Sequence, residues 1–513
     1  MFPTASNSLG KVYLVGAGPG DPGSITWRGV ECLRRADVVL YDYLVNPRIL
    51  IHARPGADML CLGRHGGPAG PGVCPDRIMP QAEVNRRLIE LARSGRSVVR
   101  LKGGDPAVFG RLAEEAEALT AAGVPLEIVP GITAALAAGS YAGIMLTHRD
   151  EASAVALVTG RETDDKQSSG LDFAALAAFP GTLVFYMGLT TAHQWTSELI
   201  SNGKPPDTPA AIVRRVSWPD QTVTHTTLGR VAEDIAAAKM RPPVVVIVGS
   251  VVAATACDWF RSRPLFGRRV LVTRPLDQAE TLCGRLSELG AECLLQPAIQ
   301  ISPPSDWGPV DSALSRLDEF DWLAFSSANG VRFLLERLLE QGGDLRRLAG
   351  LRIAAMGPGT GDELTRYHLK ADLQPEQYRA EALAEMLRSE ARGRRFLLAR
   401  ASRGRAVLPE ELVAAGATVE QIVIYESRDV PQPDAPIAAA LAAGRIDWIT
   451  VTSSAIARSL VRMFGEQLRN SCLASISPIT SATLRSLGYE PAAEATEFTM
   501  DGVVAAILAA IGN

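Results

Sequence analysis

The stretch VYLVGAGPGDPG, residues 12–23, joins an apolar strand to a glycine-rich turn, as at the start of a nucleotide-binding α/β layer. The dinucleotide fingerprint G-x-G-x-x-G has a third glycine where, counting from Gly16, this chain has Asp21. Pro19 and Pro22 also remove two of the amide donors that would hold a pyrophosphate. The turn therefore argues against NAD and favours a nucleoside ligand without phosphates, one that can carry positive charge.

Length and composition indicate a globular chain of several domains. Its 513 residues suffice for three or four domains, at roughly 100–200 residues each. The net charge of −4 gives no overall basic field, so we expect no nucleic-acid partner. The seven cysteines form no CxxC or zinc spacing and the six histidines no HxH or HExxH, so we expect reduced cysteines and no metal site. With a polar N-terminus and no membrane-length apolar run, we expect a cytoplasmic protein without a membrane partner.

Short apolar strands alternate with amphipathic helices along the chain, which predicts α/β layers with mainly parallel sheets. This series closes with PPVVVIVGSVV (242–252). WFRSRPLFG (259–267) then breaks the pattern before a fresh strand begins in RRVLVTRP (268–275). We therefore predict a first domain over 9–258, a linker over 259–267 and a second domain over 268–513.

The second half contains an internal repeat. The matched stretches are 268–275 with 394–401, 321–338 with 447–464, and 353–364 with 473–484. The first two pairs share an offset of 126 residues, and the third has an offset of 120. Three matches in order predict two similar α/β lobes that face each other across a cleft, where small-molecule sites tend to lie.

Two glycine-rich turns in the first half follow predicted strands. RLKGGDPAVFGR (100–111) delivers two glycines and an aspartate, residues 103–105, to the carboxyl end of a strand. Missing side chains let a ligand lie against the backbone there, although a tight turn with a helix cap explains the same residues. VPGITAALAAGSYAGIMLTHRD (129–150) supplies the second turn. Two such turns together favour a ligand site.

These motifs carry a family resemblance. GAGPGDP, YD, PQAEVN, RLKGGDP, VPGITAA, LTHRD and VFYMG occur in the order seen in tetrapyrrole methyltransferases, and residues 9–255 resemble uroporphyrinogen-III C-methyltransferase. Residues 268–513 resemble uroporphyrinogen-III synthase through VLVTRP, FSSANGV, MGPGT, the Tyr425 strand and SISPITSATLRSLGYEP. The resemblance implies an α/β chain: a two-lobed tetrapyrrole methyltransferase fold followed by a two-lobed α/β uroporphyrinogen-III synthase fold.

The first resemblance implies a site for S-adenosylmethionine (SAM). The sulfonium of SAM tolerates nearby carbonyls and carboxylates, so Asp21 is less out of place than it would be beside a phosphate. Many of the implied contacts would be made by backbone groups. The implied SAM contacts are Pro19, Gly103, Gly104, Asp105, Val108, Thr133, Ala134, Met187 and, by its spacing from Met187, Val216.

The implied reaction methylates two pyrrole carbons of uroporphyrinogen III and then removes a proton, which gives precorrin-2 for sirohaem or cobalamin synthesis. The family's proton acceptor maps to Asp42, which taken alone is better explained as a cap or turn residue. Its donor lysine is replaced here by Arg64, which cannot release a proton near neutrality. Either the donor is dispensable or His65 replaces it, and Arg64 then holds a substrate carboxylate. Other candidates for binding the eight carboxylates, each explained more simply as a solvated surface residue, are Arg28, Arg100, Arg149 and Arg161.

The second resemblance implies that hydroxymethylbilane loses its hydroxyl and closes with one pyrrole inverted, without a cofactor. The family's candidate acid maps to Tyr425 in IVIYES. A phenol with a pKa near about 10 is a weak acid at pH 7, so its effect should be modest, and packing at the lobe junction explains Tyr425 equally well. Thr360 and Thr480, equivalent in the two repeats, are candidates for bonding substrate carboxylates or for capping helices.

Two other functions stay open at this point. One is a later precorrin C-methyltransferase fused to a non-catalytic two-lobed binding domain, and a more distant one is an NAD oxidoreductase. No stretch resembles the dehydrogenase–chelatase module of sirohaem synthases, so we expect the product to be precorrin-2. Related methyltransferases dimerise, so we expect a homodimer through the first half that acts on small tetrapyrroles.

Overall fold

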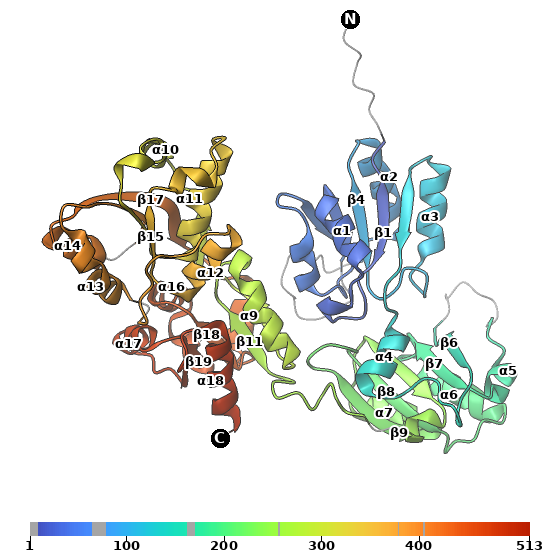
Figure 1. Ribbon diagram of the computed structural model, residues 1–513. Coiled ribbons are helices and arrows are strands. Elements are labelled where there is room, and N and C mark those ends of the chain that lie inside the picture. The colour runs from blue at the N-terminus through green and yellow to red at the C-terminus, as the bar shows by residue number, and fades with distance from the viewer. Residues whose placement is uncertain are drawn as a thin grey trace, which may run out of the picture.

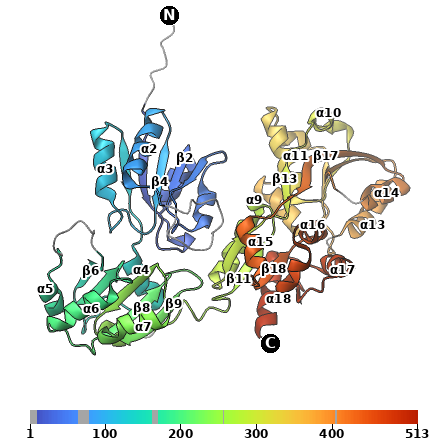
Figure 2. The same ribbon diagram turned by 180° about the vertical axis from the view of Figure 1, so that it is seen from behind.

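Four five-stranded sheets organise the chain, two in each half (Figures 1 and 2). The computed structural model describes residues 9–63, 78–161, 170–254, 257–377, 379–403 and 406–512. None of the helices in these ranges combines the length and apolar character needed to cross a bilayer. Among the cysteines in the described ranges, five are free but Cys61 is disulfide-bonded, so the expectation that all cysteines are reduced is wrong there.

The first sheet is fully parallel, in the order β3-β2-β4-β1-β5. Its strands are β1 (Val12–Gly16), β2 (Val38–Tyr41), β3 (Asp58–Cys61), β4 (Val98–Lys102) and β5 (Leu126–Val129). Helix α1 (Trp27–Arg35) packs on one face, while α2 (Gln81–Arg93) and α3 (Leu112–Ala121) pack on the other. Because helices cover both faces of the sheet, its inner strands are almost continuously apolar. Because the strands are parallel, the carboxyl ends that carry the glycine turns meet at one edge of the sheet.

The second sheet is mixed, in the order β6-β7-β10-β8-β9. Its strands are β6 (Val155–Thr159), β7 (Thr182–Tyr186), β8 (Pro209–Arg214), β9 (Thr222–Thr227) and β10 (Val244–Val248). Only β6 and β7 pair in parallel; the other three pairings are antiparallel, against the expectation of mainly parallel sheets. For β8 and β9 the reason is local, because a short loop joins them and no helical crossover separates them. The helices of this lobe are α4 (Ala134–Ala142), α5 (Phe173–Ala178), α6 (Ala192–Ser201), α7 (Val231–Ala237) and α8 (Val251–Ala254).

The third and fourth sheets form two lobes in the C-terminal half. The third, in the order β12-β11-β18-β19-β20, is parallel, and the fourth, in the order β13-β17-β16-β14-β15, is parallel except for β13. The third contains β11 (Arg269–Val272), β12 (Glu292–Leu295), β18 (Trp448–Val451), β19 (Cys472–Ser475) and β20 (Ala493–Glu494), with α9 (Leu276–Glu288), α15 (Ala435–Ala442), α16 (Ser454–Phe464), α17 (Pro478–Ser486) and α18 (Met500–Gly512). The fourth contains β13 (Ile299–Ser302), β14 (Trp322–Phe325), β15 (Arg352–Ala355), β16 (Arg395–Ala401) and β17 (Thr418–Asp429), with α10 (Gly308–Ser315), α11 (Ala328–Glu340), α12 (Pro358–Arg366), α13 (Ala380–Ala391) and α14 (Val407–Ala414).

The repeat in the sequence is present in the strand order. The run β12-β11-β18-β19 in one lobe corresponds to β17-β16-β14-β15 in the other. The prediction of two similar lobes is thus confirmed, but neither lobe is formed by a single copy of the repeat. The first copy supplies β11 and β12 to one lobe and β14 and β15 to the other, and it joins the second copy where β11 pairs with β18 and β14 pairs with β16. Each copy therefore contributes half of each lobe, which ties the two lobes together.

The segment between the halves has two buried side chains, those of Phe260 and Leu265. Phe260 is 1% exposed and meets Tyr141 of α4 edge-on at 4.8 Å, and Trp259 Nε1 donates to Ser140 O at 2.8 Å. Leu265, fully buried, belongs instead to the core of the third sheet. Contacts with the two halves interleave around Pro264, because Arg263 Nη1 donates to Ser287 O at 3.1 Å while Gly267 N donates to Pro219 O at 3.0 Å. The domain boundaries themselves stay a prediction.

Candidate functional site

Three glycine turns meet at the carboxyl edge of the first sheet. Gly18 follows β1 and Gly104 follows β4, and their backbones exchange two hydrogen bonds, of 3.1 Å from Gly18 N and 2.8 Å from Gly104 N. Gly131 lies two residues after β5. It approaches the backbone of Gly104 so closely that a Cβ on Gly131 would lie 2.3 Å from Gly104 O. Gly104 has a φ of +70°, which favours glycine. The close approach of three bare backbones explains the glycines.

A space remains beside Gly104. A Cβ built there would lie 3.8 Å from Thr133 Cα and 3.9 Å from Ala134 N, with nothing closer. Since Thr133 is the N-cap residue of α4, the first amides of that helix border the same space. The structure thus brings together several of the residues predicted to contact SAM. The turn after β4 also carries Gly103 and Val108, and Pro19 adjoins Gly18.

Asp105 fastens two of these turns. Its Oδ1 accepts from Ala107 N at 2.7 Å and its Oδ2 from Gly131 N at 2.9 Å. The carboxylate of Asp105 therefore stabilises a tight turn, as the alternative explanation of this residue held. Any contact with a cofactor would come in addition to these two bonds.

Asp21 is fully engaged by the protein. Its Oδ1 accepts from Gly23 N at 2.8 Å, and its Oδ2 accepts from Tyr141 Oη at 2.7 Å. Its own amide donates to Ser217 Oγ at 2.9 Å. Burial, together with the bond to Asp21, raises the pKa of Tyr141 to about 12, although Ser24 opposes the rise. Asp21 therefore ties the first turn to the second lobe, which explains an aspartate at this position without a ligand.

The end of β7 reaches the same place from the second lobe. Tyr186 Oη lies 2.7 Å from Thr133 Oγ1 and accepts from Ala135 N at 2.7 Å, while the Tyr186 ring lies 5.0 Å from that of Phe109. Phe109 and the neighbouring Met187 have φ values of +52° and +53°, which non-glycine residues rarely adopt and which cluster at functional sites. Met187 is 50% exposed.

Val216 differs from the other predicted contacts. Its side chain is 5% exposed and packs in the core between α4 and the second sheet. Any contact that it makes with a ligand would have to use its backbone.

Asp42, the predicted base, belongs to a largely buried charge network. It lies just after β2, and its Oδ1 is 2.7 Å from Arg100 Nη2. Arg100 Nε and Lys102 Nζ, both on β4, lie 3.1 Å and 2.7 Å from the two oxygens of Glu115, a fully buried residue of α3. Burial lowers the pKa of Lys102, and Glu115 only partly opposes this. Burial also acts against the charge of Arg100, but Asp42 and Glu115 outweigh it and raise the pKa of Arg100.

The arginines predicted to bind carboxylates are mostly engaged elsewhere. The Nη1 of Arg100 donates to Leu101 O at 3.0 Å, so each of its three nitrogens already has a protein partner. Arg28 binds Glu127 through Nε and Nη2 and Glu31 through Nη1. For Arg100 and Arg28 the structure therefore supports a structural role better than the predicted one. Of the remaining candidates, Arg149 and Arg161 are exposed, while Arg64 and its alternative His65 lie outside the described residues.

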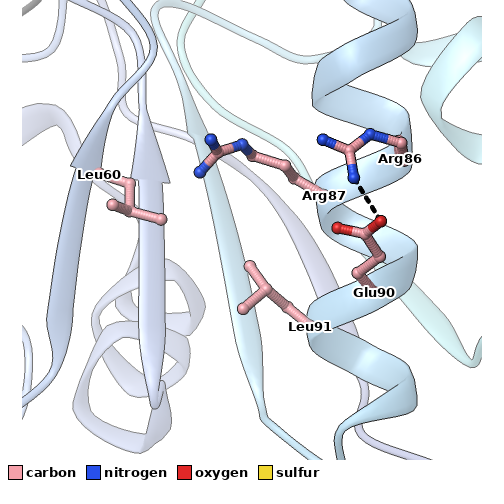
Figure 3. Close-up of a pocket in the computed structure, with 5 residues that line it drawn as sticks. All are labelled: Leu60, Arg86, Arg87, Glu90 and Leu91. Carbon is pink, nitrogen blue, oxygen red and sulfur yellow. Dashed lines mark hydrogen bonds and ion pairs between the residues drawn. The ribbon is translucent and has the colours of Figure 1, made fainter.

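A separate pocket of about 260 Å³ lies away from these turns, between edge strand β3 and helix α2 (Figure 3). Its lining residues are Leu60, Arg86, Arg87, Glu90 and Leu91. Arg86 pairs with Glu90 at its rim, as the dashed line shows. None of the predicted site residues lines it, so it adds nothing to the candidate site.

In the C-terminal half, Tyr425 lies on β17 and is 7% exposed. Its Oη lies 3.0 Å from Oγ of Ser327, the N-cap residue of α11, and its ring stacks on that of Phe333 at 5.8 Å. Burial raises the pKa of Tyr425, although hydrogen bonds with Ser327 and Asn329 oppose the rise. Tyr425 therefore stays protonated at neutral pH, and its side chain packs in the core of the fourth sheet's lobe, so the alternative of packing at the lobe junction stays a prediction.

Thr360 and Thr480 occupy matching places, each the third residue of its helix, α12 or α17. The N-cap residues are Gly357 and Ser477, so the expectation that these threonines cap helices is wrong. Both side chains are buried, at 5% and 2% exposed. Their predicted contacts with substrate stay untested.

Sequence reasoning missed three residues that shape these sites. Glu115 and Tyr186 make contacts that join separate elements, and only a folded chain brings them together. Arg274 lies in VLVTRP, and an arginine just beyond the carboxyl end of an interior strand is the signal in the sequence that points to it.

Comparison with known proteins gives the class of each half. Residues 11–232 match the family model of tetrapyrrole (corrin/porphyrin) methylases, and residues 280–505 match that of uroporphyrinogen-III synthase HemD. Porphyrin biosynthesis protein HemD of Ruminiclostridium josui is 32% identical over 97% of this chain and 95% of its own length. The chain therefore belongs to the tetrapyrrole methylase family in its first half and to the uroporphyrinogen-III synthase family in its second. It is an enzyme of tetrapyrrole biosynthesis, and the predicted resemblance is confirmed.

Two further relatives match the first half alone. The S-adenosyl-L-methionine-dependent uroporphyrinogen III methyltransferase of Methanosarcina barkeri is 43% identical over 48% of this chain and 94% of its own length. The crystal structure of uroporphyrin III C-methyltransferase from Thermus thermophilus is 39% identical over 48% of this chain and 94% of its own, with a TM-score of 0.40.

Proposed function

We propose that the second half converts hydroxymethylbilane to uroporphyrinogen III, with one pyrrole inverted, and that the first half then transfers two methyl groups from SAM to give precorrin-2. The observation that carries this proposal is the union of the two families in one chain. The synthase family is named for making the compound on which the relatives of the first half act. A later precorrin methyltransferase would have no evident use for a fused synthase, which disfavours that alternative.

The first half fits SAM at the glycine turns. The space beside Gly104, bordered by Thr133 and Ala134, lets a ligand lie against bare backbone, where no Cβ intrudes. SAM supplies a methyl group on a sulfonium, which a nucleophilic pyrrole carbon can attack. The task of the chain is to align that carbon with the methyl group, and the rigid meeting of three turns provides a fixed frame for this.

Asp42 is the proposed base for the proton that leaves the methylated carbon. Arg100 holds its Oδ1, and no described residue donates a hydrogen bond to its Oδ2. At 31% exposure, the Asp42 side chain is reachable from outside the protein. The network of Arg100, Glu115 and Lys102 thus fixes the carboxylate at the edge of the sheet that carries the SAM turns.

In the second half, the chain has to fold the linear substrate and assist loss of its hydroxyl. The pyrrole nitrogen lone pair expels the leaving group, so only a proton has to be delivered. Tyr425 is the proposed donor, because burial keeps its phenol protonated. The helices α11, α12, α16 and α17 each begin at the carboxyl end of a strand, and their first-turn amides suit the carboxylates of the substrate.

Supplying uroporphyrinogen III and SAM directly to the full chain tests the methyltransferase half. We expect two methyl groups to be transferred, measured by the mass of the product. The control Asp42→Asn should bind SAM normally by calorimetry but methylate slowly, because it removes a base without changing size. A wild-type protein that binds SAM but leaves uroporphyrinogen III unmethylated would favour the later-precorrin alternative, and full activity in Asp42→Asn would make Asp42 structural.

A further inference from the structure

An arginine stands at the carboxyl end of an interior strand in each copy of the repeat. Arg274 lies two residues after the end of β11, and its counterpart 126 residues later is Arg400 in β16. Ligands of open α/β sheets lie beyond this end of the strands. Arg274 therefore stands where a ligand between the lobes would be bound.

Arg274 is half-buried without an acidic partner. Its Nε and Nη2 donate to the backbone and side-chain oxygens of Gln278 at 3.2 and 3.0 Å, and its Nη1 contacts Met500 Sδ at 3.3 Å. No carboxylate of the described chain lies within ion-pair distance, whereas nearby Arg332 pairs with Asp277 at 2.8 Å. Burial lowers the pKa of Arg274, and Asp277 opposes this only in part. A partly desolvated guanidinium without a counter-charge is unfavourable in the free protein, so its presence here points to a ligand that supplies the charge.

A chain of polar contacts leads from Arg274 to Tyr425 in the other lobe. Gln278 Nε2, on α9, donates to Oδ1 of Asn329, on α11, at 2.9 Å. Asn329 also hydrogen-bonds with Tyr425, whose Oη lies 3.0 Å from Ser327 Oγ. The Gln278–Asn329 bond crosses from the third sheet's lobe to the fourth's. Arg274 is therefore held in a fixed relation to the proposed acid.

We propose that Arg274 is the receptor for a carboxylate side chain, acetate or propionate, of the linear tetrapyrrole in the second half, which it places beside Tyr425. This inference rests on the proposed synthase function. A planar guanidinium matches a carboxylate with two parallel hydrogen bonds, which gives orientation as well as attraction. Gln278 keeps the guanidinium in place until the substrate arrives.

Arg274→Met in the full chain tests this by initial-rate kinetics with hydroxymethylbilane, with the uroporphyrinogen isomers separated by chromatography after oxidation. Loss of a charge-assisted contact should raise KM by about 10- to 100-fold and change kcat much less. Because the arginine has no acid partner, the melting temperature should stay unchanged or rise. The KM of Arg274→Lys, which keeps the charge but not the planar fork, should lie between those of the wild-type protein and Arg274→Met. Arg346→Met removes an exposed arginine that pairs with Asp344, and it should leave KM unchanged.

The outcomes separate the inference from the proposed function. A wild-type protein that yields no type III isomer would remove the synthase function itself. If the wild-type protein yields the type III isomer and Arg274→Met has the same KM as the wild-type protein, the proposed role of Arg274 is overturned. A lower melting temperature in Arg274→Met, together with a wild-type KM in Arg274→Lys, would equally overturn it, because that pattern marks a structural arginine.

Discussion

Replacing Glu115 by glutamine tests the charge network that holds the proposed base. Glu115 is fully buried and accepts from Arg100 Nε, from Lys102 Nζ and, at 3.2 Å, from Gln81 Nε2. Glutamine keeps the shape but removes the charge that balances Lys102. The variant leaves Asp42 paired with Arg100 and Lys102 without an anionic partner.

The expected cost is large because the group is buried. Removing one partner from a buried ion pair destabilises a protein by about 3–5 kcal/mol. For a unit of roughly 250 residues this lowers the melting temperature by roughly 6 to 20 °C. The folded state already lowers the pKa of Lys102, and the variant should lower it further. Because the unfolded chain then binds more protons than the folded one, the stability of the variant should rise with pH up to the usual lysine pKa of 10.5.

Scanning calorimetry of the full chain at pH 7 and pH 9 measures both effects. The matched variant Glu115→Gln/Lys102→Met removes the unpaired cation as well, so it should regain much of the lost stability. Asp42 should also be held less firmly, which slows methylation in Glu115→Gln beyond the effect of stability. A change in melting temperature below about 2 °C in Glu115→Gln, less than the shift expected for 1 kcal/mol, would refute the reasoning.

Three further predictions concern single positions. Gly104→Val should abolish SAM binding measured by calorimetry, because its φ of +70° disfavours a branched side chain that would also fill the space beside Thr133; normal affinity would contradict that site. Phe260→Ala should cost about 3–5 kcal/mol in thermal unfolding, whereas Trp259→Ala, at 47% exposed, should cost less; equal effects would show that Phe260 is not the anchor. Tyr425→Phe should lower the synthase kcat about 10- to 100-fold with KM and melting temperature little changed, and an unchanged rate would reduce Tyr425 to packing.

The sequence was sufficient where structure is local. A glycine turn needs its glycines wherever the strands later pair, so the turns at 16–18, 103–104 and 131 could be recognised one by one. The repeat was visible for the same reason, since each copy keeps its own strand and helix pattern. Pairing is a tertiary choice, and nothing local in β11 or β18 specifies that strands from different copies pair.

The contacts that side chains make with other elements were the part of the site that the sequence could not predict. Arg100 lies in a motif and is a natural carboxylate receptor, but Asp42, just after β2, and Glu115, on α3, already occupy its guanidinium. The same holds for Asp21, whose position in the turn suggested a ligand and whose carboxylate binds Tyr141 of another lobe. The antiparallel pairing of β8 with β9 was not expected, because the Thr-rich β9 lacks a continuous apolar run.

The most direct test of the whole account is one incubation of the full chain with hydroxymethylbilane and methyl-labelled SAM. The product is analysed for ring isomer and for methyl groups per tetrapyrrole. We expect the type III isomer carrying two labelled methyl groups, made without any added enzyme. Unmethylated type III isomer would contradict the role of the first half, and the type I isomer produced by spontaneous closure would contradict the role of the second.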